Sequence, residues 1–405
     1  MSYETYRVTD LIDEIAMGPF GSNIKVSCFV DSGVPVLNGS NLEGFSLSEK
    51  AFRFVTKEKA DSLNKANAHR GDIVITHRGT LGQIVFIPQD SRYDRYVISQ
   101  SQFRVRCNDK VLPEYLVYYF HTPIGQHKLL SNASQVGVPA LARPSSTFQQ
   151  IEVELPELSI QKRVVEIITT IQKKIENNQE LNDNLQQQAA AIFRSWFVDC
   201  APFGGKTPDE WENVTLEDIT ALVSRGITPK YADDTDQIVI NQKCIRNHMI
   251  DLSLARTHTP KVINEKWLRF GDLLVNSTGD GTLGRAAQVW FQPKNITVDS
   301  HVTIARPAKE NLIFYIGLWG ILHEKEIESL HIGSTGQTEL PRDRVKAMEL
   351  LLPDNDTLDR FNALITPMAT AIVANQEENN RLAALRDAIL PKLMSGKIDV
   401  SAIQP

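Results

Sequence analysis

The stretch VVEIITTIQKKIENNQELNDNLQQQAAAIFRSW, residues 164–196, decides how the rest of the chain is organised. Its apolar residues recur at alternating spacings of four and three, which is typical of a helix whose single apolar seam packs against a partner helix. Asn178 and Asn182 interrupt the seam. A helix of about 37 residues is roughly 55 Å long at about 1.5 Å per residue. Such a helix with one apolar seam requires a partner in water.

The partner is found in the same chain, because a second stretch repeats the seam 197 positions later, after Pro353. Both polar interruptions recur, within ENNQELN (176–182) and ANQEENN (374–380). We predict that the two helices pair as an antiparallel coiled coil and that the shared asparagines form a buried polar layer that fixes the register. The predicted pairing residues are Ile168, Ile171, Ile175, Asn178, Asn182, Leu185, Ile365, Met368, Ile372, Asn375, Asn379 and Leu382.

Two residues depart from the repeated seam. Arg386 stands where the first helix has Ala189, and Pro367 lies inside the second helix, where it is expected to produce a kink. The alternative to a coiled coil is a pair of separate amphipathic helices, each packed on its own domain.

The regions before the two helices repeat each other as well. GDIVITHRGTLG (71–82) matches GDLLVNSTGDGTLG (271–284), and VISQSQFRV (97–105) matches ITVDSHVTI (296–304). The offsets drift by a few residues, as loop insertions between two copies of one domain would produce. The chain is therefore predicted to be a tandem duplication of about 200 residues per copy.

Each copy is predicted to be a strand-rich α+β domain followed by a long helix, with a pseudo-twofold axis relating the two copies. β-like runs separated by turn signals occupy 34–38, 72–76, 83–87, 102–107, 237–241, 272–276, 286–291 and 301–305. One helical stretch is expected in each domain, at 113–130 and at 310–330. The predicted segments are a domain at 1–155, a central helix at 156–200, a domain at 201–353 and a C-terminal helix at 354–405.

The loop NSTGDGTLGRAAQ (276–288) contains the pattern G-x-G-x-x-G, and Asp299 follows twenty residues after Gly279, as in a dinucleotide-binding fingerprint. In the first copy His77 stands at the place of Gly279. Strand-like residues follow the loop in both copies, whereas the fingerprint requires a helix there. We interpret Gly-Thr-Leu-Gly as a tight connection between two strands. An enzyme that binds a nucleotide through residues 279–284 remains the first alternative.

The composition excludes several classes of protein. The 405 residues carry a net charge of −6, and none of the four predicted segments has an excess of Lys and Arg, so a DNA-binding prediction needs other support. No signal peptide and no run of eighteen apolar residues is present, and four scattered cysteines suit a reducing cytoplasm, where we expect the protein. No His or Cys spacing predicts a metal site. No phosphate-binding loop of the type G-x-x-x-x-G-K-[ST] and no adenine-methyltransferase motif predicts catalysis.

The order of domain, helix, domain and helix resembles the specificity subunits of type I restriction–modification enzymes over essentially the whole chain. AIFRSWFVD (191–199) and ILPKLMSGKID (389–399) resemble the helix ends of that family. GPFGSNI (18–24), and WENVTLEDI (211–219) with GITPKY (226–231), resemble the openings of its two target recognition domains.

The resemblance implies a non-catalytic protein that binds an asymmetric, bipartite site in double-stranded DNA, with each domain reading one half. It implies that the paired helices set the gap between the halves and bind methyltransferase subunits, two per chain, and in some systems restriction subunits. S-adenosylmethionine, ATP and Mg²⁺ would bind to those partners and not to this chain. Phe193, Trp196 and Phe197 are then expected to serve helix packing or subunit docking. A coiled-coil adaptor that never reads sequence is the second alternative.

Base reading needs side chains that present paired donors and acceptors, such as Arg for guanine and Asn or Gln for adenine. Loops at matching places in the two copies carry such groups, and Lys25 and Lys230 are candidates for phosphate contacts. For each residue the alternative is an ordinary solvated loop position. The predicted DNA-binding residues are Lys25, Arg78, Thr80, Ser99, Gln100, Ser101, Gln102, Gln135, Arg143, Lys230, Asn241, Gln242, Lys243, Arg246, Asn276, Thr278, Arg285, Ser300, His301, Thr335 and Gln337.

Overall fold

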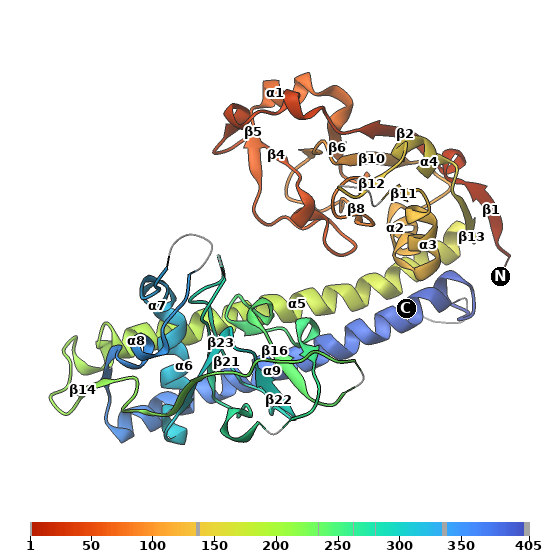
Figure 1. Ribbon diagram of the computed structural model, residues 1–405. Helices are drawn as coiled ribbons and strands as arrows, with labels where there is room; N and C mark the ends of the chain where they lie inside the picture. The colour runs from red at the N-terminus through yellow and green to blue at the C-terminus, as the bar shows by residue number, and fades with distance from the viewer. Residues whose placement is uncertain are drawn as a thin grey trace. The chain divides into compact units, whose positions relative to one another are not determined.

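The computed structural model describes residues 2–134, 138–233, 235–261, 263–279, 281–333 and 338–400. The chain divides into two compact units (Figure 1). The first unit is Met1–Ile175 with Asn380–Pro405, and the second is Glu176–Asn379. Each unit contains one strand-rich domain and about half of each long helix. No helix among the described residues is both long enough and apolar enough to cross a membrane.

The first unit is built on a four-stranded antiparallel sheet in the order β2-β10-β7-β8 and a five-stranded sheet in the order β3-β5-β4-β9-β6. Short pairs β1-β13 and β11-β12 complete its strands. The bounds are β1 Glu4–Arg7, β2 Ile12–Met17, β3 Phe29–Val30, β4 Val34–Val36, β5 Arg53–Val55, β6 Asn67–His69, β7 Ile73–Thr76, β8 Ile84–Phe86, β9 Arg95–Val97, β10 Gln102–Cys107, β11 Ala133–Ser134, β12 Ala140–Leu141 and β13 Glu152–Leu155. Its short helices are α1 Lys57–Ser62, α2 Pro113–His121, α3 Pro123–Leu130 and α4 Pro144–Gln149.

The second unit repeats the four-stranded sheet and the pair formed by its first and last strands, which confirms the predicted duplication. Its four-stranded sheet has the order β15-β23-β20-β21, its three-stranded sheet has the order β19-β16-β22, and its short pairs are β14-β24 and β17-β18. The bounds are β14 Glu212–Thr215, β15 Thr220–Arg225, β16 Ile238–Ile240, β17 Ile245–Arg246, β18 Met249–Ile250, β19 Arg256–Thr257, β20 Leu273–Asn276, β21 Ala286–Gln288, β22 Ile296–Val298, β23 Val302–Pro307 and β24 Glu349–Leu352. Its short helices are α6 Ile313–Leu322, α7 Glu324–Ser329 and α8 Arg342–Lys346.

The eight predicted strands are all present, but the helical stretch predicted in each domain is wrong in one respect, because each is two helices. Thr122 separates α2 from α3 with an extended backbone (φ −72°, ψ 157°). Pro123 disfavours the helical conformation of the residue before it, and the Thr122 hydroxyl accepts from Gly125 N at 3.0 Å to cap the new helix. In the second domain His323 separates α6 from α7.

The two long helices, α5 (Leu158–Phe197) and α9 (Asn355–Met394), each contain 40 residues. They lie side by side and antiparallel (Figure 1). Asn178 Nδ2 donates to Asn379 Oδ1 at 2.9 Å, and Asn375 Nδ2 donates to Asn182 Oδ1 at 2.9 Å. The predicted asparagine layer is therefore present, with Asn178 and Asn182 buried and Asn375 and Asn379 half-buried. Helix α9 runs through Pro367 without interruption.

The other predicted pairing residues line the same seam. Ile168, Ile175, Ile365 and Ile372 are buried, and Ile171, Leu185, Met368 and Leu382 are half-buried. Each end of the helix pair also enters the core of one domain. In the first unit Val164 and Ile168 of α5 share a core with Leu390 and Leu393 of α9. In the second unit Phe193 packs against Phe361 and Tyr315, so the aromatic residues near the end of α5 serve packing, as predicted.

The Gly-Asp pairs that begin the repeated motif anchor the four-stranded sheets. The Asp272 carboxylate accepts two hydrogen bonds from the Arg306 guanidinium at 2.8 Å, and Asp72 accepts the equivalent pair from Arg106 at 2.9 and 3.2 Å. Each carboxylate also accepts from a backbone N–H three residues earlier, which fixes the turn into the strand. Both aspartates are fully buried, so the fork–fork geometry must compensate their desolvation.

Removing this carboxylate in the second domain is expected to be costly. Asp272→Ala leaves the Arg306 guanidinium buried without its counter-ion, and breaking one partner of a buried pair lowers the free energy of unfolding by about 3–5 kcal/mol. Urea unfolding followed by circular dichroism measures the change. Asp343→Ala is the control, because the exposed Asp343–Arg342 pair contributes at most about 1 kcal/mol. Equal effects of the two substitutions would contradict the structural role of the buried pair.

Candidate nucleic-acid interface

Polar residues gather in both domains at the end of the four-stranded sheet where β7 turns into β8 and β20 turns into β21. The backbone geometry is the same in the two copies. His77 N donates to Ser101 O and Ser277 N donates to His301 O, each at 2.8 Å. These bonds hold the loop after the central strand against the start of the neighbouring strand, β10 or β23. The strand pairs β7-β8 and β20-β21 are antiparallel, which confirms that Gly-Thr-Leu-Gly connects two strands.

A third segment completes the same edge in each domain. Arg78 forms a β-bridge with Ala140, and Thr278 forms one with Glu339. Leu141 N donates to His77 O at 2.9 Å and Leu340 N donates to Ser277 O at 2.8 Å. The equivalent bonds make Arg78 equivalent to Thr278 and His77 equivalent to Ser277, so the predicted match of His77 with Gly279 is wrong. The two domains therefore present different side chains from one backbone frame.

In the second domain four predicted residues come together in one hydrogen-bonded group. Thr278 Oγ1 lies 2.7 Å from His301 Nδ1 and donates to Gln242 Oε1 at 3.3 Å. Asn276 Nδ2 donates to Gln242 O at 3.1 Å. His301 is exposed and Gln242 is half-buried, so the group offers imidazole, hydroxyl and amide functions to a ligand at the surface. Asn241 caps the short helix that carries Gln242 and Lys243 by accepting from Lys243 N at 2.9 Å.

Two of the predicted residues are buried and shape the loops. Asn276 has no exposed surface, and Gln102 is 1% exposed. Gln102 Oε1 accepts from Ser99 N at 2.9 Å, which closes the turn that carries Gln100 and Ser101. The buried side chains of Asn276 and Gln102 therefore stabilise the conformations of the loops.

The remaining predicted residues lie around these edges. Gln100, Arg78, Thr80, Lys25 and Arg143 are exposed in the first domain, while Ser99 and Ser101 are half-buried. Arg143 lines a hollow of about 660 Å³ with His127, Lys128 and Glu152. Arg285 donates to Gly281 O within its own loop at 2.6 Å. Within the described part of the chain, Lys230, Arg246 and Ser300 contribute no side chain to the hydrogen-bonded group. Gln135, Thr335 and Gln337 lie outside the described residues.

The opening segment of each domain contributes residues that the sequence reading did not select. A β-carbon on Gly18 would overlap Ser99 O, and one on Gly226 would overlap Val298 O, so only glycine allows these segments to lie against the loops. Gly18 N donates to Gln102 O at 2.8 Å and Gly226 N to Val302 O at 3.1 Å. In the sequence, the first glycines of GPFGSNI and GITPKY indicate this close packing of the opening segments. Phe20, beside Gly18, is 83% exposed.

Arg225, which precedes Gly226, is a second residue that was not selected. Its guanidinium donates to Leu340 O at 2.8 Å and pairs with the Glu339 carboxylate at 2.6 Å. It therefore holds the third segment of the edge in place. Met17 occupies the matching position before Gly18, so the first domain has no arginine there to make these contacts.

Burial changes the ionisation of two groups at these edges. Asp299 is 3% exposed, and its burial raises the pKa of the carboxyl although it accepts from His301 N at 2.9 Å. Burial also lowers the pKa of His77, whose Nε2 lies 3.2 Å from Gln100 O. A neutral His77 can donate to that carbonyl and hold the Gln100 loop without adding charge.

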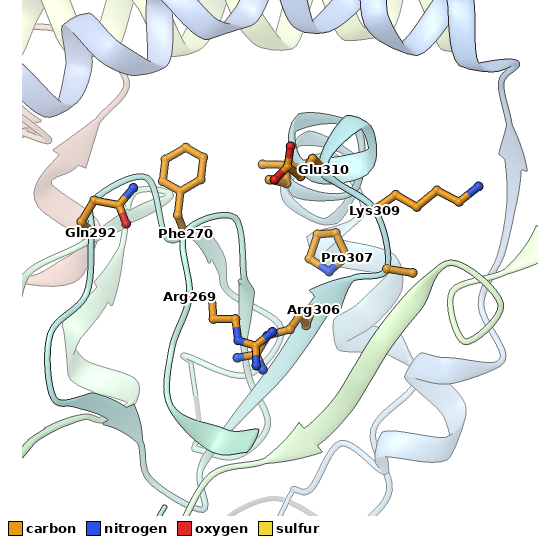
Figure 2. A pocket seen from close by; sticks show the side chains of 9 residues that line it. Arg269, Phe270, Gln292, Arg306, Pro307, Lys309 and Glu310 are labelled. Atoms are coloured by element: carbon orange, nitrogen blue, oxygen red, sulfur yellow. The ribbon is translucent and has the colours of Figure 1, made fainter. Parts of the chain in front are cut away.

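A separate hollow of about 590 Å³ lies at the opposite end of β20 and β23 (Figure 2). Arg269, Arg306, Lys309 and Glu310 are among the residues that line it. Arg306 is already engaged by Asp272 and by two backbone carbonyls, of Glu265 and Trp267. Its charge is therefore compensated within the fold, and the polar edge at the other end of the strands remains the candidate interface.

Comparison with known proteins gives these edges a context. Residues 3–187 match the family described as the type I restriction modification DNA specificity domain. The type I restriction enzyme MjaIX specificity subunit of Methanocaldococcus jannaschii is 23% identical over 97% of this chain and 93% of its own length. The HindI specificity subunit of Haemophilus influenzae is 23% identical over 81% of this chain and 87% of its own. The S subunit of a type I restriction–modification system from M. genitalium shares the fold, with a TM-score of 0.57, 13% identity, and 97% and 96% of the two chains covered.

The buried Asp299 carboxyl predicts a pH-dependent effect of its substitution. A raised pKa in the folded state means that stability is lost as pH rises from the unfolded value, about 3.9, through the folded pKa. An amide in place of this carboxyl would carry no charge and could still accept from His301 N. Asp299→Asn should therefore stabilise the protein at neutral pH, and the gain should shrink towards about pH 4. Urea unfolding between these pH values measures the difference.

Asp218→Asn is the matched control, because hydrogen bonds from Thr215 lower the pKa of Asp218. Its stabilising contribution is present above the unfolded pKa and is lost as pH falls, so this substitution should destabilise the protein at neutral pH. The same pH trend in both variants would argue against burial as the cause of the Asp299 shift.

Proposed function

We infer the function from a premise that the relatives supply: the chain belongs to the specificity subunits of type I restriction–modification systems. As such it is a non-catalytic DNA-recognition protein. We propose that each strand-rich domain reads one half of a bipartite site in double-stranded DNA through the polar edge of its four-stranded sheet. The observation that carries this proposal is that both edges share one backbone frame and differ in the side chains they present.

The side-chain difference supports an asymmetric target. Arg78 and Ser101 occupy the places that Thr278 and His301 occupy in the second domain. An arginine can present two parallel donors to guanine, whereas a hydroxyl and an imidazole present other patterns of donors and acceptors. Two domains with different groups at equivalent places would read different base sequences. Lys25 and Lys230, exposed in the opening segments, are suited to phosphate contacts that position the domains.

The protein would act together with methyltransferase subunits, for which we propose two docking positions per chain, and with restriction subunits where a system has them. S-adenosylmethionine, ATP and Mg²⁺ would belong to those partners. The exposed flanks of α5 and α9 are the natural docking surface, because a helix pair repeated at an offset of 197 residues offers the same surface twice.

Neither alternative function has comparable support. A nucleotide fingerprint needs a helix after its glycines, and strand β21 follows Gly284 instead. An adaptor that uses only its coiled coil would have no need for two polar edges built on one frame. Sequencing of bound DNA fragments separates the adaptor from the proposed function, since an adaptor enriches no motif.

Substitutions in one domain should alter one half of the target only. Arg78→Ala removes a candidate guanine contact in the first domain, and His301→Ala removes an exposed imidazole in the second. Each should reduce discrimination at its own half-site by about 1–3 kcal/mol per affected base pair and leave the other half unchanged. The measurement is genome-wide mapping of methylated adenines with the cognate methyltransferase subunit. Each variant is the control for the other, and relaxation of both halves by either one would contradict separate reading.

The helix pair should set the gap between the two halves. Removing residues 185–191 together with the facing residues 366–372 deletes one heptad from each helix and leaves the asparagine layer intact. Seven residues rise about 10 Å, which corresponds to about three base pairs at about 3.4 Å each. The unread gap in the mapped motif should shorten by that amount. An unchanged gap would rule out the helices as the spacer.

A further inference from the structure

The asparagine layer of the helix pair is the same for every combination of the two helices. Asn178 donates to Asn379, and Asn375 donates to Asn182. A shift of 197 residues converts Asn178 into Asn375 and Asn182 into Asn379, so the two hydrogen bonds are exchanged by the duplication. Two copies of α5 from different chains could form the same layer. The asparagines therefore fix orientation and register, but they do not decide which helix pairs with which.

A second layer lacks this symmetry. In the first unit the Arg386 guanidinium of α9 donates to Gln172 Oε1 of α5 at 2.9 Å. The duplication relates Gln172 to Ala369 and Arg386 to Ala189. Both alanines are buried in the core of the second unit. One layer is therefore a charged donor with its acceptor, and its counterpart is two methyl groups.

Pairing of like helices would mismatch both layers. Two copies of α5 in the observed register would place Gln172 opposite Ala189 at both ends. Two copies of α9 would place Arg386 opposite Ala369 at both ends. The Arg386 side chain is only 18% exposed. A largely buried guanidinium that faces a methyl group loses the Gln172 acceptor and keeps only Asp387 of its own helix, so its desolvation is compensated less completely.

Arg386 also joins the helix pair to the first domain. Its guanidinium carbon lies 5.0 Å from the centre of the Phe45 ring, a cation–π geometry, and it pairs with Asp387 at 2.9 Å. In a pair of two α5 helices Ala189 would stand at this place, and Phe45 would lose the contact. The mismatch therefore extends from the helix seam into the domain core that contains Phe45.

We propose that the Gln172–Arg386 layer favours the pairing of α5 with α9 over the pairing of like helices from two chains. The asparagine layer sets the register, and this layer sets the partner. Each helix pair then joins one copy of each domain. The proposal concerns chain pairing and holds whether or not the domains read DNA.

The test compares how full-length chains pair when they refold together. Two preparations with different affinity tags are mixed, unfolded in urea and refolded, and the fraction of mixed-tag dimer is measured by pull-down and light scattering. Gln172→Ala with Arg386→Ala replaces the asymmetric layer by one that matches Ala189–Ala369. We expect an increase of at least about tenfold in mixed dimer over the unchanged chain, since the Gln172–Arg386 hydrogen bond of each chain no longer separates the pairings. Lys173→Ala with Arg381→Ala, exposed on the same helices, is the control and should have no effect.

A complementary variant makes the two layers alike by introducing a second Gln–Arg pair. Ala189→Arg with Ala369→Gln supplies the Gln–Arg pair at the second place, so that like helices can satisfy both layers. This variant should also increase mixed dimer, and the double-alanine variant decides the question if an arginine at the buried Ala189 position prevents refolding. The proposal is overturned if the variants that refold form no more mixed-tag dimer than the unchanged chain.

Discussion

The structure depends on one constraint, the antiparallel pairing of two helices that are copies of each other. A seam about 40 residues long cannot remain exposed, and in the observed register the four asparagines hydrogen-bond one another near the middle of the helix pair. Because the ends of the same seam enter the two domain cores, the pairing also determines what each domain packs on. Val164 and Leu390 belong to one core, and Phe193 and Phe361 to the other. Loss of the pairing would expose part of both cores.

The sequence predicted those features that repeat or follow a regular period. The heptad seam, the asparagine layer and the strands around Gly-Asp recur at nearly constant offsets, so each copy supports the interpretation of the other. The breaks at Thr122 and His323 could not be found in this way, because a strongly apolar segment such as 310–330 shows little periodicity to interrupt. Pro123 was a local signal for the first break, and the continuous apolar run around it concealed that signal.

The candidate site was predicted in its position but only partly in its composition. Asn276 and Gln102 have the residue types that read adenine, yet both are buried and hold loops in shape. The Asn276 side chain donates to Gln242 O, on a segment 34 residues earlier in the sequence. Arg225 was not selected for the same reason, since its role depends on contact with Glu339 and Leu340. Local composition contains no information about either contact.

The two ends of the central strands are constrained differently, and comparison of the two copies shows which residues are the same in both and which differ. At one end Asp72–Arg106 and Asp272–Arg306 are the same pair with nearly the same geometry, because a buried carboxylate permits few other partners. At the other end, Arg78 and Ser101 of the first domain correspond in position to Thr278 and His301 of the second. The loops that carry them are held by backbone hydrogen bonds, which do not depend on the side chains. A frame fixed by a buried ion pair and by main-chain bonds can accept many side chains at its exposed edge. That freedom is what allows one fold, used twice in a chain, to present two different recognition surfaces.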